Sequence, residues 1–391
     1  MHIDVTGRAR NSRRSSSFMA WVVAVGAVAP VLAAPTVQQV SGPLDHNSSI
    51  TITGSGFGSK PTAAPVVWDN ATGNSLSAKW DGAMPNAAPG YNTQYHAPMR
   101  GIDPPHSHVT RYIAGAHATN KGADSGYDVL VYKNVTLPAA GAPPYIYMSW
   151  YQRADNGWSF AAHAANTVDD DNNFKNFVYS VCCGAYEQPY WYTMYGPPHP
   201  ASSTDTDVQW AINGQQLDNP DVNGHNAWWN RAVNPMAGKW SKVQVLIRVS
   251  ADKDGYVKLW ENGRLVIDYA GRTDNFPGNR RTLAIGGYAR MQGHTNNWRY
   301  FDDLYVDTSQ ARVVLADKPV LSQASIIENQ IPSSWSDGSI TATVNLGQFT
   351  QGQTAYLFVV DANGNASATG TSVTAGGMVA VPSPPPSVSV R

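Results

Sequence analysis

Apolar and polar residues alternate along the segment Trp240–Ser250. Val243 and Ile247 lie on one side of an extended chain, and Lys242 and Gln244 lie on the other. A period of two is typical of a β-strand that is buried on one face only. The segment therefore predicts a strand with its apolar face toward a core and its polar face toward solvent.

The next two strands are predicted from turn signals. Asp252–Gly255 is rich in turn-forming residues, and the strand Tyr256–Glu261 then meets the dipeptide Asn262-Gly263. Asn-Gly is the dipeptide that most readily adopts the two positive φ values of a type I′ hairpin. We therefore expect Arg264–Tyr269 to return antiparallel to the strand before it.

Short segments of this kind recur along the chain, and helical periodicity is nearly absent. Such a pattern favours an all-β protein built from antiparallel sheets. Besides the strands above, we predict strands at Asp128–Tyr132, Tyr145–Arg153, Asn173–Val181, Val208–Ile212 and Thr282–Tyr288.

Two adjacent carboxylates interrupt the last apolar strand of this region, Arg299–Asp307. Because successive side chains point to opposite faces, either Asp302 or Asp303 must face the interior. An unpaired buried charge costs several kcal/mol, so an arginine, a set of backbone amides or a Ca²⁺ ion must accompany it. Asp302 is the candidate metal ligand. No cofactor is required, and a structural Ca²⁺ ion and a salt bridge remain as alternatives.

The order of these features resembles the concanavalin A-like lectin/glucanase superfamily, which includes the laminin G-like domains. The features are Trp240 before paired strands, the Asn-Gly hairpin, Ile285–Tyr288 and Phe301–Asp307. The resemblance implies an antiparallel jelly-roll sandwich over residues 69–313. Its motifs are general patterns, so they indicate a fold better than a function.

The two ends of the chain resemble parts of one IPT/TIG immunoglobulin-like domain. Ser49–Gly58 alternates apolar and hydroxyl residues before a Gly-rich turn, and Ile331–Val344 and Thr354–Ser367 resemble closing strands. Residues 36–68 and 314–376 together have the size of one small sandwich, so we predict a split domain with the jelly roll inserted into it. The alternative is that each end adds edge strands to the large sandwich. Residues 377–391 form a Pro-rich tail.

Composition favours a secreted protein. The chain has 391 residues, a formal net charge of -1, 13 Trp and 19 Tyr, and therefore lacks the basic footprint of a nucleic-acid-binding protein. Arginines precede the apolar run Phe18–Leu32, and small residues follow it, which predicts a signal peptide over residues 1–33. After its removal we expect a secreted or cell-surface protein with no membrane insertion.

The adjacent cysteines Cys182 and Cys183 are expected to be free thiols in a strand.

The acidic residues do not form a glycosidase motif. Retaining glycosidases need two closely spaced carboxyl groups, whereas Glu187, Glu261 and Glu328 are isolated in the sequence. A polysaccharide lyase would instead need Arg, Gln or Asn to neutralise a uronate carboxylate, with Tyr or His as the base. Gln209 is one such candidate, although the known motifs of the alginate-lyase jelly rolls are missing.

Aromatic residues cluster in two segments that also contain amides and an arginine. Flat rings suit the C–H faces of sugars, and the polar neighbours suit their hydroxyl groups. The candidate ligand-binding residues are Trp158, Tyr186, Tyr190, Trp191, Tyr192, Gln209, Trp228, Trp229 and Arg231. We therefore expect a lectin-like protein that binds an extracellular polysaccharide in an aromatic groove. The alternatives are a polysaccharide lyase that acts by β-elimination on a uronate polymer, and a surface or filament structural protein.

Overall fold

The structure is a computed structural model that describes most of the chain after the predicted signal peptide. The described residues are 33–71, 78–84, 92–97, 103–108, 112–117, 129–138, 144–154, 172–182, 190–195, 209–213, 226–231, 238–274, 276, 278–286, 289–291 and 297–379. Residues 34–391 form one compact unit. Apart from Ala33, the predicted signal peptide lies outside the described residues, as does the Pro-rich segment after Val379.

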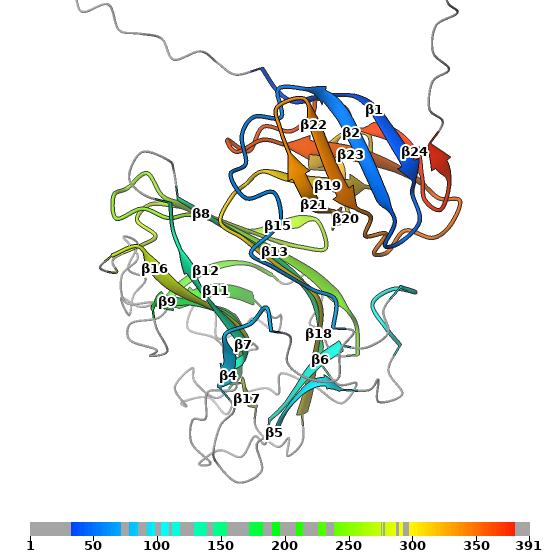
Figure 1. Ribbon diagram of the computed structural model, residues 1–391. Coiled ribbons are helices and arrows are strands. Elements are labelled where there is room, and N and C mark those ends of the chain that lie inside the picture. The colour runs from blue at the N-terminus through cyan, green and yellow to red at the C-terminus, as the bar shows by residue number, and fades with distance from the viewer. Residues whose placement is uncertain are drawn as a thin grey trace, which may run out of the picture. The chain divides into compact units, whose positions relative to one another are not determined.

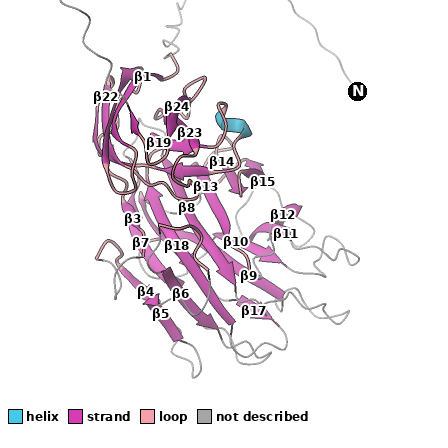
Figure 2. Ribbon diagram, turned by 90° about the vertical axis from the view of Figure 1, so that its right-hand side faces the viewer, coloured by secondary structure: helices cyan, strands magenta, loops and turns pink. Residues whose placement is uncertain are grey.

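The regular secondary structure of the described residues is almost entirely β-strand, so the prediction of an all-β protein is confirmed (Figure 2). Within the described ranges the helical element is the short 3-10 helix η2 (Leu321–Gln323). None of the helices in this part of the chain has the length and apolar character needed to cross a membrane.

The first and last strands of the chain form two sheets, which we call the small sandwich. One sheet has the order β21-β22-β2-β1-β25 and the other has the order β20-β19-β23-β24. In Figure 1 the blue strands β1 and β2 lie beside the orange strand β22. The bounds are β1 Thr36–Pro43, β2 Ser49–Ser55, β19 Arg312–Ala316, β20 Ile327–Asn329, β21 Ile331–Trp335, β22 Ser339–Thr343, β23 Thr354–Val360, β24 Thr371–Thr374 and β25 Met378–Val379.

The small sandwich has an apolar core of its own. Ile50 and Ile52 from β2 lie in one cluster with Leu315 from β19 and Leu357 from β23, and all four are fully buried. Residues 36–55 therefore complete a sheet and a core whose other strands come from the C-terminal part of the chain.

The strands between these ends form the large sandwich, which consists of two 8-stranded sheets. The β8 sheet has the order β15-β14-β13-β8-β18-β6-β5 with β3 beside β18, and the β9 sheet has the order β12-β11-β10-β9-β16-β7-β4 with β17 beside β9. The β8 sheet contains β3 Val67–Asp69, β5 Asn92–Ala97, β6 Tyr112–His117, β8 Tyr145–Ala154, β13 Ser241–Arg248, β14 Tyr256–Glu261, β15 Arg264–Ala270 and β18 Asn297–Asp307. The β9 sheet contains β4 Gly82–Met84, β7 Val129–Thr136, β9 Asn172–Val181, β10 Tyr190–Tyr195, β11 Gln209–Asn213, β12 Asn226–Arg231, β16 Arg280–Gly286 and β17 Ala289–Met291.

The hairpin predicted from Asn262-Gly263 is confirmed. Asn262 has φ 49° and Gly263 has φ 78°, and β14 and β15 pair antiparallel on either side. The positive φ values are those that a type I′ turn requires at its two central residues.

The polar side of β13 is buried, contrary to the expectation from its alternation. Lys242 and Gln244 are only 5% and 6% exposed. Lys242 Nζ donates to Glu328 Oε2 of β20 at 2.9 Å, so this side of the strand faces the small sandwich rather than solvent. A period of two identifies the face toward one core but does not reveal what covers the other face.

A β-bulge in β18 changes the face assignment of the paired carboxylates. Asp303 has φ 48°, and the pairing with β8 shifts register between Asp302 and Tyr305. Phe301 and Leu304 consequently both reach the core, and both carboxylates are buried instead of one.

The expectation of free thiols is wrong for Cys182, because this residue is disulfide-bonded. It lies just after the last residue of β9, at a bend of the chain. The expectation rested on the strain of a bridge between two adjacent cysteines.

Candidate functional site

The β9 sheet has one face toward the core of the large sandwich and one face away from it. Phe177 of β9 and Trp210 and Ile212 of β11 belong to the core. Because side chains alternate along a strand, Gln209 and Ala211 occupy positions on the opposite face. We call this opposite face the outer face of the β9 sheet.

Strand register assembles a row of polar positions on this outer face. In neighbouring antiparallel strands, residues directly opposite each other share a face. Gln209 is opposite Tyr195 on one side and Arg231 on the other. Tyr195 is in turn opposite Asn173, and Asn173 is opposite Arg290 of β17. The polar row is therefore Arg290, Asn173, Tyr195, Gln209 and Arg231.

A β-bulge between β9 and β10 is what brings Asn173 into this row. Tyr192 pairs with Phe177, but Thr193 pairs with Lys175, so the register skips Asn176. The skipped position reverses the face of the residues before it in β9. Without the bulge, simple alternation from Phe177 would assign Asn173 to the core.

Two of the predicted tryptophans occupy outer-face positions near the polar row. Trp191 is opposite Val178 and Asn213, and Trp228 is opposite Ala211. The polar row and the two tryptophan positions are separated along the strands by a few residues, at about 3.3 Å per residue. The outer face thus combines aromatic, amide and cationic residue types, as a carbohydrate-binding face requires.

Other predicted ligand-binding residues lie elsewhere. Tyr192 is 2% exposed and its ring lies 4.9 Å from that of Phe177, inside the core. Tyr190 is opposite Tyr179, which is also a core residue. Trp158 and Tyr186 lie outside the described residues. Trp229 belongs to β12, where the pairing with β11 shifts register.

The outer face of the β9 sheet is buried at its centre. Val178, Ala211 and Ala284 are each at most 1% exposed although they do not belong to the core cluster. Nearby, Thr282 Oγ1 donates to Asn134 Oδ1 at 2.7 Å across adjacent strands. The polar row lies at the ends of β10, β11 and β12, away from these buried residues.

Asn173, Tyr195 and Arg290 were not among the candidate site residues of the sequence analysis. Each is unremarkable in the sequence by itself. Their common row depends on the pairing of β17 with β9 and on a bulge, and neither is visible in hydrophobic alternation.

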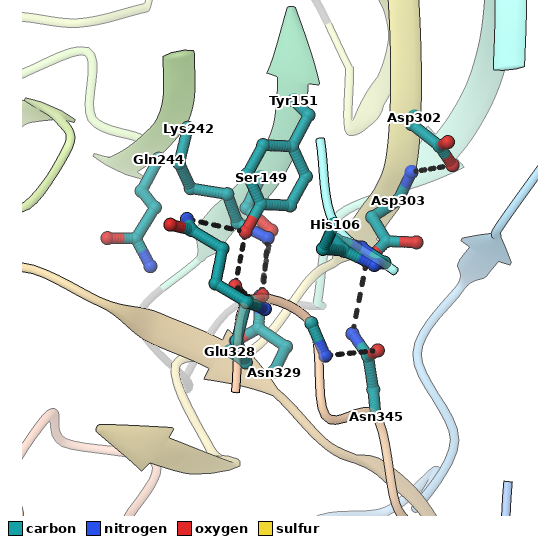
Figure 3. A network of polar contacts seen from close by, with 12 residues as sticks. His106, Ser149, Tyr151, Lys242, Gln244, Asp302, Asp303, Glu328, Asn329 and Asn345 are labelled. Carbon is teal, nitrogen blue, oxygen red and sulfur yellow. Dashed lines mark hydrogen bonds and ion pairs between the residues drawn. The ribbon is translucent and has the colours of Figure 1, made fainter. Parts of the chain in front are cut away.

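A second polar assembly lies where the β8 sheet meets the small sandwich (Figure 3). Glu328 is fully buried and receives hydrogen bonds from the Tyr151 hydroxyl and from Lys242 Nζ, the latter at 2.9 Å. Lys242 Nζ also lies 4.1 Å from the centre of the Tyr151 ring. Burial, reinforced by the Glu328 charge, raises the pKa of Tyr151 well above its usual value. The tyrosine is therefore a neutral donor, and the group serves to join the two sandwiches.

Asp303 forms the other half of this assembly. His106 Nε2 lies 3.0 Å from Asp303 Oδ2, and Asn345 Nδ2 of the small sandwich donates to the same oxygen at 3.2 Å. Burial alone would raise the pKa of Asp303, but the His106 hydrogen bond and nearby charges lower it below the usual value. Asp303 is thus a stable buried carboxylate.

Asp302 has a different environment. Its Oδ1 accepts a hydrogen bond from the Asp303 backbone N at 2.7 Å, while its Oδ2 has no hydrogen-bond partner among the described residues. Burial, and then the charge of Asp303, raises the pKa of Asp302 well above its usual value. Within the described ranges, no group of three or more His, Cys, Asp or Glu residues is arranged to hold a metal ion. A Ca²⁺ ion at Asp302 stays a prediction.

Glu261 is also a structural carboxylate. It is fully buried, and it accepts a hydrogen bond from Ser241 Oγ at 3.0 Å within the β8 sheet. A second hydrogen bond, from Trp210 Nε1 at 3.1 Å, links the two sheets of the large sandwich. Glu261 and Glu328 therefore lack the access to solvent that a glycosidase acid and nucleophile need.

No protein-family model matches the chain, and no curated protein matches it. Similar solved structures include several polysaccharide lyases. They include an endo-β-1,4-glucuronan lyase from the fungus Trichoderma reesei, with 13% identity over 63% of this chain and 96% of that chain and a TM-score of 0.39. An alginate lyase has 13% identity over 64% and 98% of the two chains and a TM-score of 0.40. An alginate lyase from Aplysia kurodai has 9% identity over 63% and 100% and a TM-score of 0.40. Similarity at this distance assigns no activity to the chain.

Proposed function

We propose that the protein acts on an acidic polysaccharide along the outer face of the β9 sheet and cleaves it by β-elimination. The observation that carries this proposal is the polar row, in which Tyr195 and Gln209 are directly opposite each other and Arg231 is opposite Gln209. This reading reverses the order of preference reached from the sequence, where lectin-like binding came first.

The residue types of the row match the requirements of elimination from a uronate. Removal of the proton at C5 is assisted when cationic or amide donors neutralise the adjacent carboxylate. Arg231, Gln209 and Asn173 would supply those donors. Tyr195 would take the C5 proton as the C4=C5 double bond forms and the C4–O bond breaks, and it would return a proton to the leaving oxygen.

Trp191 and Trp228 support binding of a sugar chain beside the polar row. Their positions on the same face would let rings contact sugar C–H groups while the row engages carboxylates. Binding without cleavage, as in a lectin, is the second candidate because it needs only these rings and their amide neighbours.

The test uses the mature chain with uronate polymers and, for comparison, a neutral polysaccharide. Elimination creates an unsaturated product whose ultraviolet absorbance can be followed directly. We expect cleavage of at least one uronate polymer, a loss of at least about 100-fold in kcat for Tyr195→Phe with KM nearly unchanged, and a rise in KM for Trp191→Ala. The matched control is Tyr190→Phe, because Tyr190 belongs to the core side of the same strand.

The outcomes separate the two candidates. Retention on a polysaccharide affinity gel that depends on Trp191, together with no product from any uronate polymer, would support the lectin and reject the lyase. Full cleavage by Tyr195→Phe would reject the role assigned to the row.

We also propose the finer architecture expected from the sequence. The large sandwich would be a concanavalin A-like jelly roll, and the small sandwich would be an IPT/TIG-like domain split between residues 36–68 and 314–376. Pairing of β2 with both β1 and β22 supports the split. The protein would be secreted or held at the cell surface, where extracellular polysaccharides are found, with the small sandwich as a rigid mount.

A further inference from the structure

Three histidines meet where the large sandwich contacts the small one, next to the assembly in Figure 3. His46 lies between β1 and β2, whereas His106 and His108 lie in the described segment 103–108. The rings of His46 and His108 are stacked, with centroids 4.6 Å apart and planes 17° apart. The rings of His106 and His108 are 5.9 Å apart. None of these residues belongs to the outer face of the β9 sheet.

Hydrogen bonds to these rings determine which nitrogens carry protons. The backbone N of Leu346 donates to His46 Nδ1 at 3.4 Å, and the backbone N of His108 donates to His106 Nδ1 at 3.3 Å. Both Nδ1 atoms must be unprotonated, because an N–H group cannot accept a hydrogen bond. His106 Nε2 then carries the hydrogen that is donated to Asp303 Oδ2.

His108 links the two sandwiches directly. Its Nε2 lies 3.3 Å from the carbonyl oxygen of Phe349, which belongs to the small sandwich, so it donates an N–H to that oxygen. The stacked contact with His46 is a second link between the same parts. Both links use the ring of His108, and the stacking is favourable only while the two imidazoles do not both carry charge.

We propose that this cluster is a pH-sensitive latch: neutral His46, stacked on His108, holds the two sandwiches together, and protonation of His46 in mild acid loosens their contact. Protonated His46 would present an N–H to the Leu346 N–H and a positive charge to the His108 ring. The first change replaces a hydrogen bond by a repulsion between two donors at the junction.

The charged groups around His46 define the pH range. Asp45 precedes it and is exposed, His108 and His106 approach from segment 103–108, and Asp303 approaches from β18. Burial, and then the neighbouring His108, lowers the pKa of His46 from 6.5 to about 4, while Asp303 acts in the opposite direction. A state in which the contact between His46 and His108 is broken therefore takes up a proton on His46 at a higher pH than the closed form does. Stability of the closed form should fall as pH decreases from 6.5 toward about 4 and then level off.

The first measurement is the thermal unfolding midpoint of the full mature chain as a function of pH. We expect the wild-type midpoint to drop through this range, and the drop to be at least halved in His46→Gln and in His108→Gln. Because the two rings act on each other, the double variant should differ little from either single variant. Asp268→Asn, at an exposed carboxylate of β15, is the control and should keep the wild-type pH profile.

The second measurement is the NMR titration of the His46 ring in the folded protein, which does not depend on the stability of any variant. A midpoint well below 6.5, with a resonance shift of Leu346 in the same range, supports the latch. The proposal is overturned by titration of His46 at the value of a free histidine, or by an unchanged pH profile in both His46→Gln and His108→Gln.

Discussion

Glu328 shows how much a single buried residue depends on partners from another part of the chain. Its carboxylate belongs to β20, whereas Tyr151 and Lys242 belong to β8 and β13. Replacing Lys242 with Met would leave a buried carboxylate without its cation. We expect Lys242→Met to lower the free energy of unfolding by about 3–5 kcal/mol, measured by urea denaturation.

A matched double variant separates the ion pair from simple loss of packing. Lys242→Met combined with Glu328→Gln removes both charges, so it should lose less than the sum of the single changes. Lys318→Met is the surface control, because the Lys318 side chain is 51% exposed and 3.9 Å from Asp317. Additive losses in the double variant would show that the buried pair is not coupled.

Replacing Asp302 should stabilise the protein at neutral pH, in contrast to replacing Lys242. Its pKa is raised well above 3.8, so the folded state favours the neutral carboxyl. The stability of the fold therefore falls as the pH rises above the pKa that Asp302 has in the unfolded chain. Asp302→Asn keeps an oxygen for the Asp303 N–H and removes the titration. We expect the variant to be more stable than the wild type at neutral pH by about 1 kcal/mol, and the gain to vanish in acid.

The same pair of proteins tests the predicted Ca²⁺ ion. If Asp302 binds Ca²⁺, adding the ion must raise the unfolding midpoint of the wild type and leave that of Asp302→Asn unchanged. A stabilised Asp302→Asn with no effect of Ca²⁺ or of a chelator on either protein would favour the neutral carboxyl.

At the scale of the strand and turn, the β14–β15 hairpin was predictable because its signal is local. Asn262-Gly263 specifies the turn, and alternation specifies the strands on either side. The β18 and β9 bulges were not predictable, because an inserted residue leaves the hydrophobic pattern almost unchanged while it moves Asp303 and Asn173 to other faces. Of the strands that carry the candidate site, β9 and β11 were predicted from the sequence, whereas β10, β12, β17 and the polar row were not.

Gly263 allows the hairpin prediction to be tested quantitatively. A Cβ atom at Gly263 would lie 2.5 Å from the carbonyl oxygen of Ala324, in addition to the strain of its φ of +78°. Gly352 has a φ of +82° but no atom within 4 Å of the same position. We expect Gly263→Ala to destabilise by about 1–3 kcal/mol more than Gly352→Ala in thermal unfolding. Equal losses would mean that the turn can move away from Ala324.

At the scale of the whole molecule, the sequence indicated two sandwiches but not the contact between them. Lys242 and Gln244 gave the pattern of a solvent-exposed face, and no local feature marks Lys242 as the partner of Glu328 in the small sandwich. Contacts between residues far apart in the chain depend on how completed sheets pack, which alternation within one strand does not encode.

The pairing of the chain ends yields the last prediction. β2 lies between β1 and β22, and its Ile50 and Ile52 are fully buried in the core of the small sandwich. Deleting residues 36–55 would expose that core and leave β22 with one neighbour, at a cost of about 2–5 kcal/mol for each of these isoleucines alone. We expect the region 312–379 to lose its resistance to proteolysis in this variant, whereas deletion of 381–391 should leave it resistant. A protease-resistant C-terminal region without residues 36–55 would show that the small sandwich folds from the C-terminal strands alone. The N-terminal strands would then be additions to that sandwich and not an essential part of a split domain.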